Sequence, residues 1–213
     1  MKLYDYFRSS AAYRVRIALN LKNVAPERAS VHLRRGAQRA EDYLAMNPQG
    51  LVPALVTEGG DVLTQSLAII EWLEESYPKP ALLPGDAAGR ARVRSLALAI
   101  ACDIHPLNNL RVLNYLTGTL GVTDAQRDGW CRYWCDVGLE ALETRLARER
   151  ATGAFCHGAA PTIADVCLVP QLANARRVDL DLAPYPTLLR IESACVALPA
   201  FADAAPARQP DAE

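Results

Sequence analysis

Two serines and an arginine near the amino terminus have types and spacing that could do chemistry. Arg8, Ser9 and Ser10 follow an apolar pattern that predicts a strand over residues 1–6, and residues 11–21 then predict a helix. The first N–H groups of a helix have no partner within it, and the helix dipole favours negative charge there. We call such a junction between a strand and the following helix a corner. A hydroxyl donor and a guanidinium at such a corner could bind an anion, including a thiolate, and lower the pKa of a thiol. The alternative is that one serine only caps the helix.

A second candidate corner lies at Gln65 and Ser66, where a polar pair opens a helical pattern that reaches Tyr77. The Ser66 hydroxyl and the adjacent free N–H groups can bind a carboxylate. A plain N-cap is the commoner meaning of a serine before a helix. Both roles can hold together because capping and anion binding use the same geometry.

Polar residues also interrupt the apolar pattern further along the chain. His105, Asn109 and Arg111 fall within one long predicted helix, where a polar cluster is costly unless it is paired or lines a cleft. The alternative for His105 is a core histidine with satisfied hydrogen bonds. Arg176 and Arg177 form another basic candidate, although an isolated arginine pair is usually solvated.

The composition argues against several classes of protein. The chain has 213 residues, of which 51% are hydrophobic, and a net charge of −1, so neither nucleic acid nor an anionic membrane is an expected partner. No apolar run approaches the ~20 residues of a membrane span, and no secretory signal is visible, so we expect a soluble cytoplasmic protein. The six cysteines form no C-x-x-C pattern, which indicates buried side chains rather than a redox pair or a metal site.

The elements that must position these residues differ between the two parts of the chain. The first 80 residues predict the order β-α-β-α-β-β-α, in which a Glu58-Gly59-Gly60-Asp61 turn joins the last two strands. The first helix has an apolar face, and Arg14 and Arg16 are predicted to lie off it.

Residues 78–89 are rich in Pro, Gly and Ala and predict a linker, after which only helical patterns follow. Residues 90–116 predict one long helix with a kink at Pro106. Three further helices are predicted, at 123–150, after a capping box of Thr162 and Asp165, and at 188–198. The tail beyond Phe201 is rich in Ala and Pro and is predicted to be loosely ordered.

Several motifs resemble the glutathione transferase superfamily. They are Asn47-Pro48-x-Gly50-x-Val52-Pro53-Ala54-Leu55, Gln65-Ser66 and the Thr162–Asp165 box, which together span most of the chain. Residues 8–19 and 103–109 resemble the zeta class of that superfamily. The resemblance implies an α/β thioredoxin-like N-terminal domain over residues 1–80, which binds glutathione, and an all-α C-terminal domain over 88–213, which binds substrate. It also implies a homodimer.

One departure from the family pattern concerns the thiol. The zeta signature often has Cys and Ser after its serine pair, where this chain has Ala11 and Ala12. The resemblance therefore implies that the cofactor, glutathione, supplies the thiol, and that Ser9 or Ser10 donates a hydrogen bond to its sulfur.

The resemblance also assigns roles to residues that spacing alone leaves open. It implies a cis Val52–Pro53 bond, which would expose the Val52 backbone as an edge for the cysteinyl part of glutathione. The implied contacts to glutathione come from Ser9, Ser10, Gln38, Val52, Pro53, Gln65, Ser66, His105 and Asn109. Three arginines are implied to bind substrate carboxylates, because a guanidinium can pair with a carboxylate through two hydrogen bonds: Arg8, Arg111 and Arg176.

The implied activity is cis–trans isomerisation of maleylacetoacetate or maleylpyruvate to the fumaryl isomer, in the catabolism of aromatic compounds. Glutathione would add reversibly to the cis double bond and be regenerated, and no metal would take part. Two alternatives stay open at this point. One is a transferase that conjugates or dehalogenates small electrophiles such as α-halo acids, and the other is a non-catalytic module of the same fold that binds a protein partner.

Overall fold

The computed structural model describes residues 1–213, and the chain divides into two compact units. The first unit comprises residues 1–81 together with 196–213, and the second comprises residues 82–195. The sequence prediction places everything after residue 88 in the helical domain, whereas the C-terminal segment groups with the first unit.

A four-stranded mixed sheet forms the centre of the first unit, and its strand order is β2-β1-β3-β4. The strands are β1 (Lys2–Asp5), β2 (Glu27–Ser30), β3 (Ala54–Val56) and β4 (Val62–Thr64). Strand β1 pairs parallel to β2 and antiparallel to β3, with Leu3 opposite Arg28 on one side and Leu55 on the other. Strands β3 and β4 form the predicted antiparallel hairpin. The thioredoxin-like prediction is therefore confirmed.

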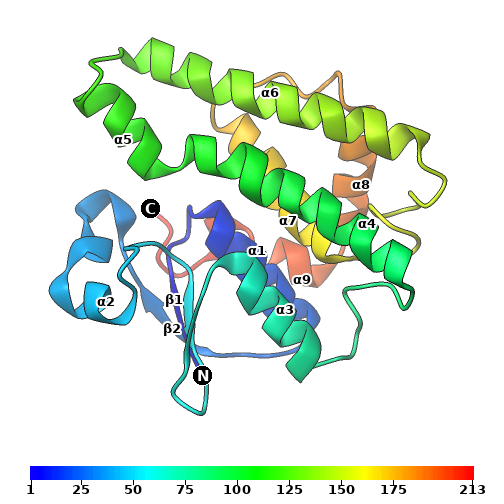
Figure 1. Ribbon diagram of the computed structural model, residues 1–213, viewed down its shortest axis with the longest axis horizontal. Coiled ribbons are helices and arrows are strands. Elements are labelled where there is room, and N and C mark those ends of the chain that lie inside the picture. Colours follow the sequence, from blue (N-terminus) through cyan, green and yellow to red (C-terminus); the bar gives the residue numbers. More distant parts are fainter. The chain divides into compact units, whose positions relative to one another are not determined.

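Four helices complete the first unit: α1 (Ser10–Leu21), α2 (Glu41–Met46), α3 (Ser66–Ser76) and α9 (Pro199–Ala202). The strands lie between α2 on one side and α1 and α3 on the other (Figure 1). The expectation that Arg14 and Arg16 lie off the buried face of α1 is wrong, since they are only 1% and 2% exposed. Helix α1 contacts both α3 and α9, so it is buried on nearly every side.

The second unit is entirely helical, as predicted. Its α-helices are α4 (Ala87–Leu98), α5 (Leu110–Gly118), α6 (Asp124–Arg148), α7 (Ile163–Arg176) and α8 (Pro186–Val196). The predicted capping box of α7 is present, because the Asp165 carboxylate accepts hydrogen bonds from the N–H (2.8 Å) and the hydroxyl (2.8 Å) of Thr162. None of the helices combines the length and the apolar character that a membrane crossing needs.

The single helix predicted over residues 90–116 is wrong. Helix α4 ends at Leu98 and is followed by a π-helical turn (Ala99–Ile104) and a 3-10 turn (His105–Asn108), after which α5 begins. Pro106 lacks a backbone N–H, and its ring disfavours a continuous helix at this point. The break is therefore wider than the kink that Pro106 alone predicts.

The expectation of a loosely ordered tail beyond Phe201 is also wrong. Phe201 and Ala204 are fully buried within the first unit, and a 3-10 turn (Pro206–Arg208) follows them. Gln209 is only 6% exposed. Ala and Pro in this tail therefore accompany a packed segment rather than a mobile one.

Candidate active site

The N-terminus of α1 is the corner that the sequence predicts, and Ser9 is its N-cap. The Ser9 Oγ accepts a hydrogen bond from the Ala12 N–H at 3.2 Å, which uses a lone pair of the oxygen. A hydroxyl has one proton and two acceptor lone pairs. The Ser9 O–H can therefore still donate to a ligand while the oxygen caps the helix. Ser10, the first residue of α1, is buried, whereas Ser9 is partly exposed.

A tight turn over Tyr6–Ser9 connects β1 to α1, and the Ser9 N–H donates to the Tyr6 carbonyl at 2.9 Å. Arg8 is exposed at the third position of this turn. The turn thus presents a guanidinium directly before the capping serine. An exposed cation at the amino end of a helix adds to the field that favours a bound anion.

The loop before β3 forms an unpaired peptide edge beside that turn. The Val52–Pro53 bond is cis, as the family resemblance implies. The backbone of Val52 lies outside the sheet ladder, which begins at Ala54, and no turn or loop hydrogen bond engages it. Phe7 of the turn and Val52 belong to one buried apolar cluster, so the edge and the α1 corner are neighbours.

Two side chains fix the loop that leads to Val52. The Tyr43 hydroxyl and the Asn47 Nδ2 both donate to the Leu51 carbonyl, at 2.6 Å and 2.8 Å. Burial raises the pKa of Tyr43 to about 12, so this hydroxyl stays a donor. These two hydrogen bonds hold the carbonyl that directly precedes the Val52 peptide.

Gln38 lies close to the same loop, and its position depends on a glycine. A Cβ at Gly50, whose φ is +59°, would lie 2.9 Å from the Gln38 carbonyl oxygen, so only glycine permits this approach. The side-chain Oε1 of Gln38 is buried and has no hydrogen-bond partner. A buried acceptor of this kind is unusual in a folded protein and fits a missing N–H donor.

Gln65 and Ser66 form the second corner, at the N-terminus of α3. Gln65 has a φ of +69°, a strained conformation for a residue with a side chain. Its Nε2 donates to the Gln49 Oε1 at 2.8 Å. The buried Ser66 hydroxyl opens α3 and accepts a hydrogen bond from the Nη1 of Arg14 at 3.3 Å.

Arg14 is a candidate site residue that the sequence analysis missed. Its guanidinium is buried and reaches from α1 to the positive end of α3. A fixed cation behind free helix N–H groups strengthens the attraction of that corner for a carboxylate. The only signal in the sequence is that two arginines interrupt an otherwise apolar helix.

His105, Asn109 and Arg111, the candidate residues of the second unit, lie around the break between α4 and α5. Asn109 is the N-cap of α5, and its Oδ1 accepts the Arg111 N–H at 3.1 Å. The Arg111 side chain is exposed, and His105 is half-buried in the 3-10 turn. Capping accounts for Asn109 without a ligand, so its contact with glutathione stays a prediction. A π-helical turn within a longer helix often marks a functional position.

Arg176, the third predicted carboxylate ligand, lies at the end of α7 and already has a partner. Both of its terminal nitrogens donate to the Glu192 carboxylate of α8, and this pairing raises the pKa of Arg176. The guanidinium could bind a substrate carboxylate only by sharing or exchanging Glu192. Its role in binding stays a prediction.

The cysteines supply no thiolate to the first unit, which contains none of them. All six are free thiols, and every one except Cys102 is buried. Burial raises the pKa of Cys131 and Cys156, and that of Cys135 to about 11. No cluster of residues suited to a metal is present. The first unit therefore supplies no thiolate of its own at the α1 corner.

Comparison with known proteins agrees with this geometry. Residues 8–76 match the family model for the glutathione S-transferase N-terminal domain, and residues 138–203 match that for the C-terminal domain. The maleylpyruvate isomerase of a Ralstonia species is 52% identical over 211 residues, which cover 99% of each chain. A solved maleylpyruvate isomerase, described as a bacterial transferase of the zeta class, is 51% identical and superposes with a TM-score of 0.97 over 100% of both chains. The chain belongs to the zeta-class glutathione transferase family.

Another solved relative has ligands in its crystal structure. The maleylacetoacetate isomerase of Methylobacterium extorquens, solved with bound malonate and glutathione, is 46% identical, with a TM-score of 0.98 over 100% of both chains. Relatives at about half identity thus include both isomerases. The predicted fold, a thioredoxin-like domain followed by helices, is that of the zeta-class family.

Proposed function

We propose that this zeta-class protein is a glutathione-dependent isomerase that converts maleylacetoacetate or maleylpyruvate to the fumaryl isomer in the catabolism of aromatic compounds. One observation carries the proposal. Ser9 caps α1 while keeping a hydroxyl proton to donate, in a unit that has no cysteine of its own. Such a corner can stabilise a thiolate that a ligand brings.

The residues present fit glutathione at three points. The unpaired Val52 edge suits the extended cysteinyl backbone of a peptide, which can add to it as a further strand. The α3 corner at Gln65 and Ser66, with Arg14 behind it, suits the γ-glutamyl carboxylate. The orphaned Oε1 of Gln38 suits a peptide N–H near the glycyl end. His105 and Asn109 are proposed as further contacts from the second unit.

The chain's own residues would then act on the sulfur and on the substrate charges. When bound, glutathione supplies a thiol whose reversible addition to the cis double bond allows that bond to rotate. The Ser9 hydroxyl and the α1 dipole hold the sulfur ionised, with Ser10 as the alternative donor. Each unit by which they lower the thiol pKa corresponds to about 1.4 kcal/mol of preference for the thiolate.

Arg8, Arg111 and Arg176 are proposed to bind the substrate carboxylates and to stabilise the negative charge that develops on the conjugated carbonyl. Guanidinium groups suit both tasks because they pair with carboxylates through two hydrogen bonds and keep their charge. The malonate in the Methylobacterium relative supports a dicarboxylate-like substrate. Of the three arginines, Arg8 and Arg111 are exposed, and Arg176 would have to leave or share Glu192.

The decisive test follows the fate of glutathione. Enzyme, glutathione well below the substrate concentration, and maleylacetoacetate or maleylpyruvate are mixed, and the fumaryl product and remaining glutathione are measured. The proposal predicts many turnovers for each glutathione, with none consumed. Loss of one glutathione for each product would instead indicate a conjugating transferase. Comparing kcat/KM for the two substrates then identifies the preferred one.

We also propose that the chain acts in the cytoplasm as a homodimer, as the family resemblance implies. Light scattering on the purified protein tests the assembly. A mass of two chains supports the proposal, and a mass of one chain contradicts it.

A further inference from the structure

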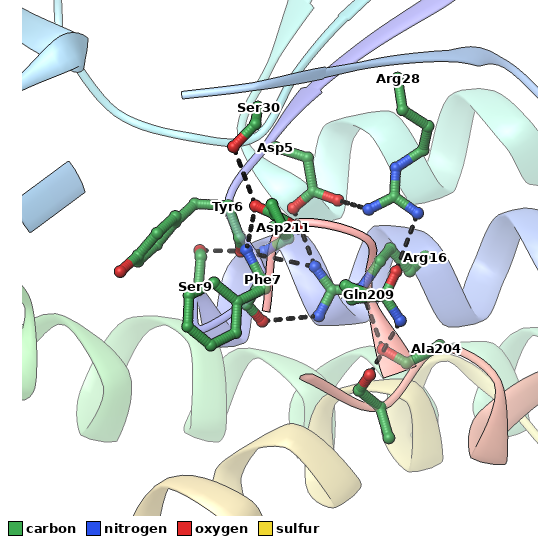
Figure 2. A network of polar contacts seen from close by, with 12 residues as sticks. Asp5, Tyr6, Phe7, Ser9, Arg16, Arg28, Ser30, Ala204, Gln209 and Asp211 are labelled. Atoms are coloured by element: carbon green, nitrogen blue, oxygen red, sulfur yellow. Dashed lines mark hydrogen bonds and ion pairs between the residues drawn. The ribbon is translucent and has the colours of Figure 1, made fainter. Parts of the chain in front are cut away.

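The last residues of the chain make polar contacts with the turn that precedes Ser9. Figure 2 shows Asp211, Gln209 and Ala204 of this C-terminal tail gathered around Phe7 and Arg16. Asp211 follows Phe7 by 204 positions in the chain. None of these tail contacts is a backbone–backbone hydrogen bond of a helix or of the sheet.

Side chains, rather than other backbone groups, hold the backbone of Phe7 in the turn. Its N–H donates to the Asp211 Oδ2 at 3.1 Å, and its carbonyl accepts from the Arg16 Nη2 at 3.0 Å. Phe7 is buried. An N–H in such a place costs about 1–3 kcal/mol if its acceptor is removed. The conformation of the turn, and with it the position of Arg8, therefore depends on the Asp211 carboxylate.

The tail also fixes Arg16, the second side chain on this turn. The Nε of Arg16 donates to the Ala204 carbonyl at 2.9 Å, and its Nη1 pairs with Asp5 at 2.8 Å. The same Nη1 lies 3.4 Å from the Tyr6 carbonyl, which accepts the Ser9 N–H. Tail backbone and turn backbone thus share one buried guanidinium.

Gln209 folds the tail so that Asp211 reaches the turn. Its Nε2 donates to the carbonyls of Asp203 (2.9 Å) and Ala205 (2.8 Å), and its Oε1 accepts from Arg28 at 2.9 Å. The Ser30 hydroxyl, at the end of β2, donates to the same Asp211 oxygen at 2.9 Å. The Asp211 carboxylate is therefore held from two sides.

We propose that Asp211 is a positioning residue for the reaction: its carboxylate fixes the Tyr6–Ser9 turn, so the C-terminal tail sets the geometry of Arg8 and of the Ser9 hydroxyl. This inference rests on the proposed function, in which Ser9 faces the glutathione sulfur. The charged acceptor matters because a hydrogen bond to an ionised group is stronger than one between neutral groups.

Three variants test the proposal: Asp211→Ala, Asp211→Asn and, as a matched control, Asp203→Asn. Asparagine at 211 keeps an acceptor oxygen for the Phe7 N–H, whereas alanine keeps none. Asp203 lies in the same tail, but its exposed carboxylate pairs only with Arg208. Unfolding midpoints are measured for all variants so that kinetics are compared between folded proteins.

The measured quantities are kcat/KM and the pKa of bound glutathione, followed through the ultraviolet absorbance of its thiolate. For Asp211→Ala we expect kcat/KM to fall about tenfold, because a small misplacement of a site residue is costly. We expect the thiol pKa to rise by about half a unit to one unit, as donor and sulfur separate. Asp211→Asn should recover only part of both losses, because its neutral oxygen is a weaker acceptor for the Phe7 N–H, and Asp203→Asn should match the wild type.

An Asp211→Ala protein whose thiol pKa equals that of the wild type overturns the proposal, even if its stability falls. Equal losses in Asp211→Ala and Asp203→Asn overturn it as well. Failure of the proposed function is a different result, because the wild type would then bind glutathione without isomerising either substrate. The thiol pKa of the binary complex still reports on the turn in that case.

Discussion

Replacing Ser9 separates its structural role from its chemical one. The Ser9 oxygen caps α1 by accepting the Ala12 N–H at 3.2 Å, and its hydroxyl proton is the one that we propose donates to the glutathione sulfur. Ser9→Ala removes both functions. Ser9→Gly also removes the hydroxyl that serves both functions, but glycine itself is a tolerable N-cap residue. Ser10→Ala leaves the cap intact.

The expected magnitudes differ for the two functions. Loss of the cap in Ser9→Ala should lower the free energy of unfolding by about 1 kcal/mol, and Ser9→Gly should cost only a few tenths. A hydrogen bond to a charged group contributes about 1.5–3 kcal/mol. Both Ser9 variants should therefore raise the thiol pKa of bound glutathione by about 1–2 units. At neutral pH, kcat/KM should fall about 10- to 100-fold in both.

The assay pairs chemical denaturation with a pH titration of thiolate absorbance in the glutathione complex. We expect Ser9→Ala and Ser9→Gly to differ in stability but to share the raised thiol pKa. A normal thiol pKa in Ser9→Gly, with the whole rise appearing in Ser10→Ala, would refute the assignment and make Ser10 the donor.

Three further predictions follow from the buried groups. Arg14→Met should raise KM for glutathione about tenfold with little change in kcat. Arg14→Lys keeps the positive charge near Ser66 and should recover part of the affinity for glutathione. An unchanged KM in Arg14→Met would show that Arg14 does not belong to the site. A thiol reagent should modify Cys102 rapidly in the native protein and the other five cysteines only on unfolding, so two or more fast thiols would contradict the burial. Burial raises the pKa of Cys135 to about 11, so the native state keeps a proton that the unfolded chain loses above about pH 8.5. Between that pH and the native pKa, this thiol should lower the free energy of unfolding by about 1.4 kcal/mol per pH unit. The decrease of the free energy of unfolding with pH should be shallower in Cys135→Ala.

Local patterns predicted the elements of the first 80 residues well. Alternation, helical spacing and the Gly59-Gly60 turn are properties of short segments, and the strands and helices lie where those patterns indicate. The corner at Ser9 was predicted for the same reason, because an N-cap depends on residues only three positions apart. The family resemblance, rather than the local pattern, supplied the cis bond before Pro53.

The features that the sequence did not predict depend on distant partners. Arg14 and Arg16 look like solvated residues until α3 and α9 cover them. The tail looks disordered by composition, yet Asp211 finds its donor in Phe7 at the opposite end of the chain. The break after Leu98 is predicted only in part, since Pro106 predicts a kink but not the π-helical turn before it.

A crystal structure of the glutathione complex would show directly whether Ser9 donates to the glutathione sulfur. We expect the cysteinyl backbone to pair with Val52, the γ-glutamyl carboxylate to lie at the Ser66 end of α3, and the sulfur to lie within hydrogen-bond distance of the Ser9 hydroxyl. Glutathione bound elsewhere, or a sulfur pointing away from the α1 corner, would show that Ser9 does not stabilise the thiolate.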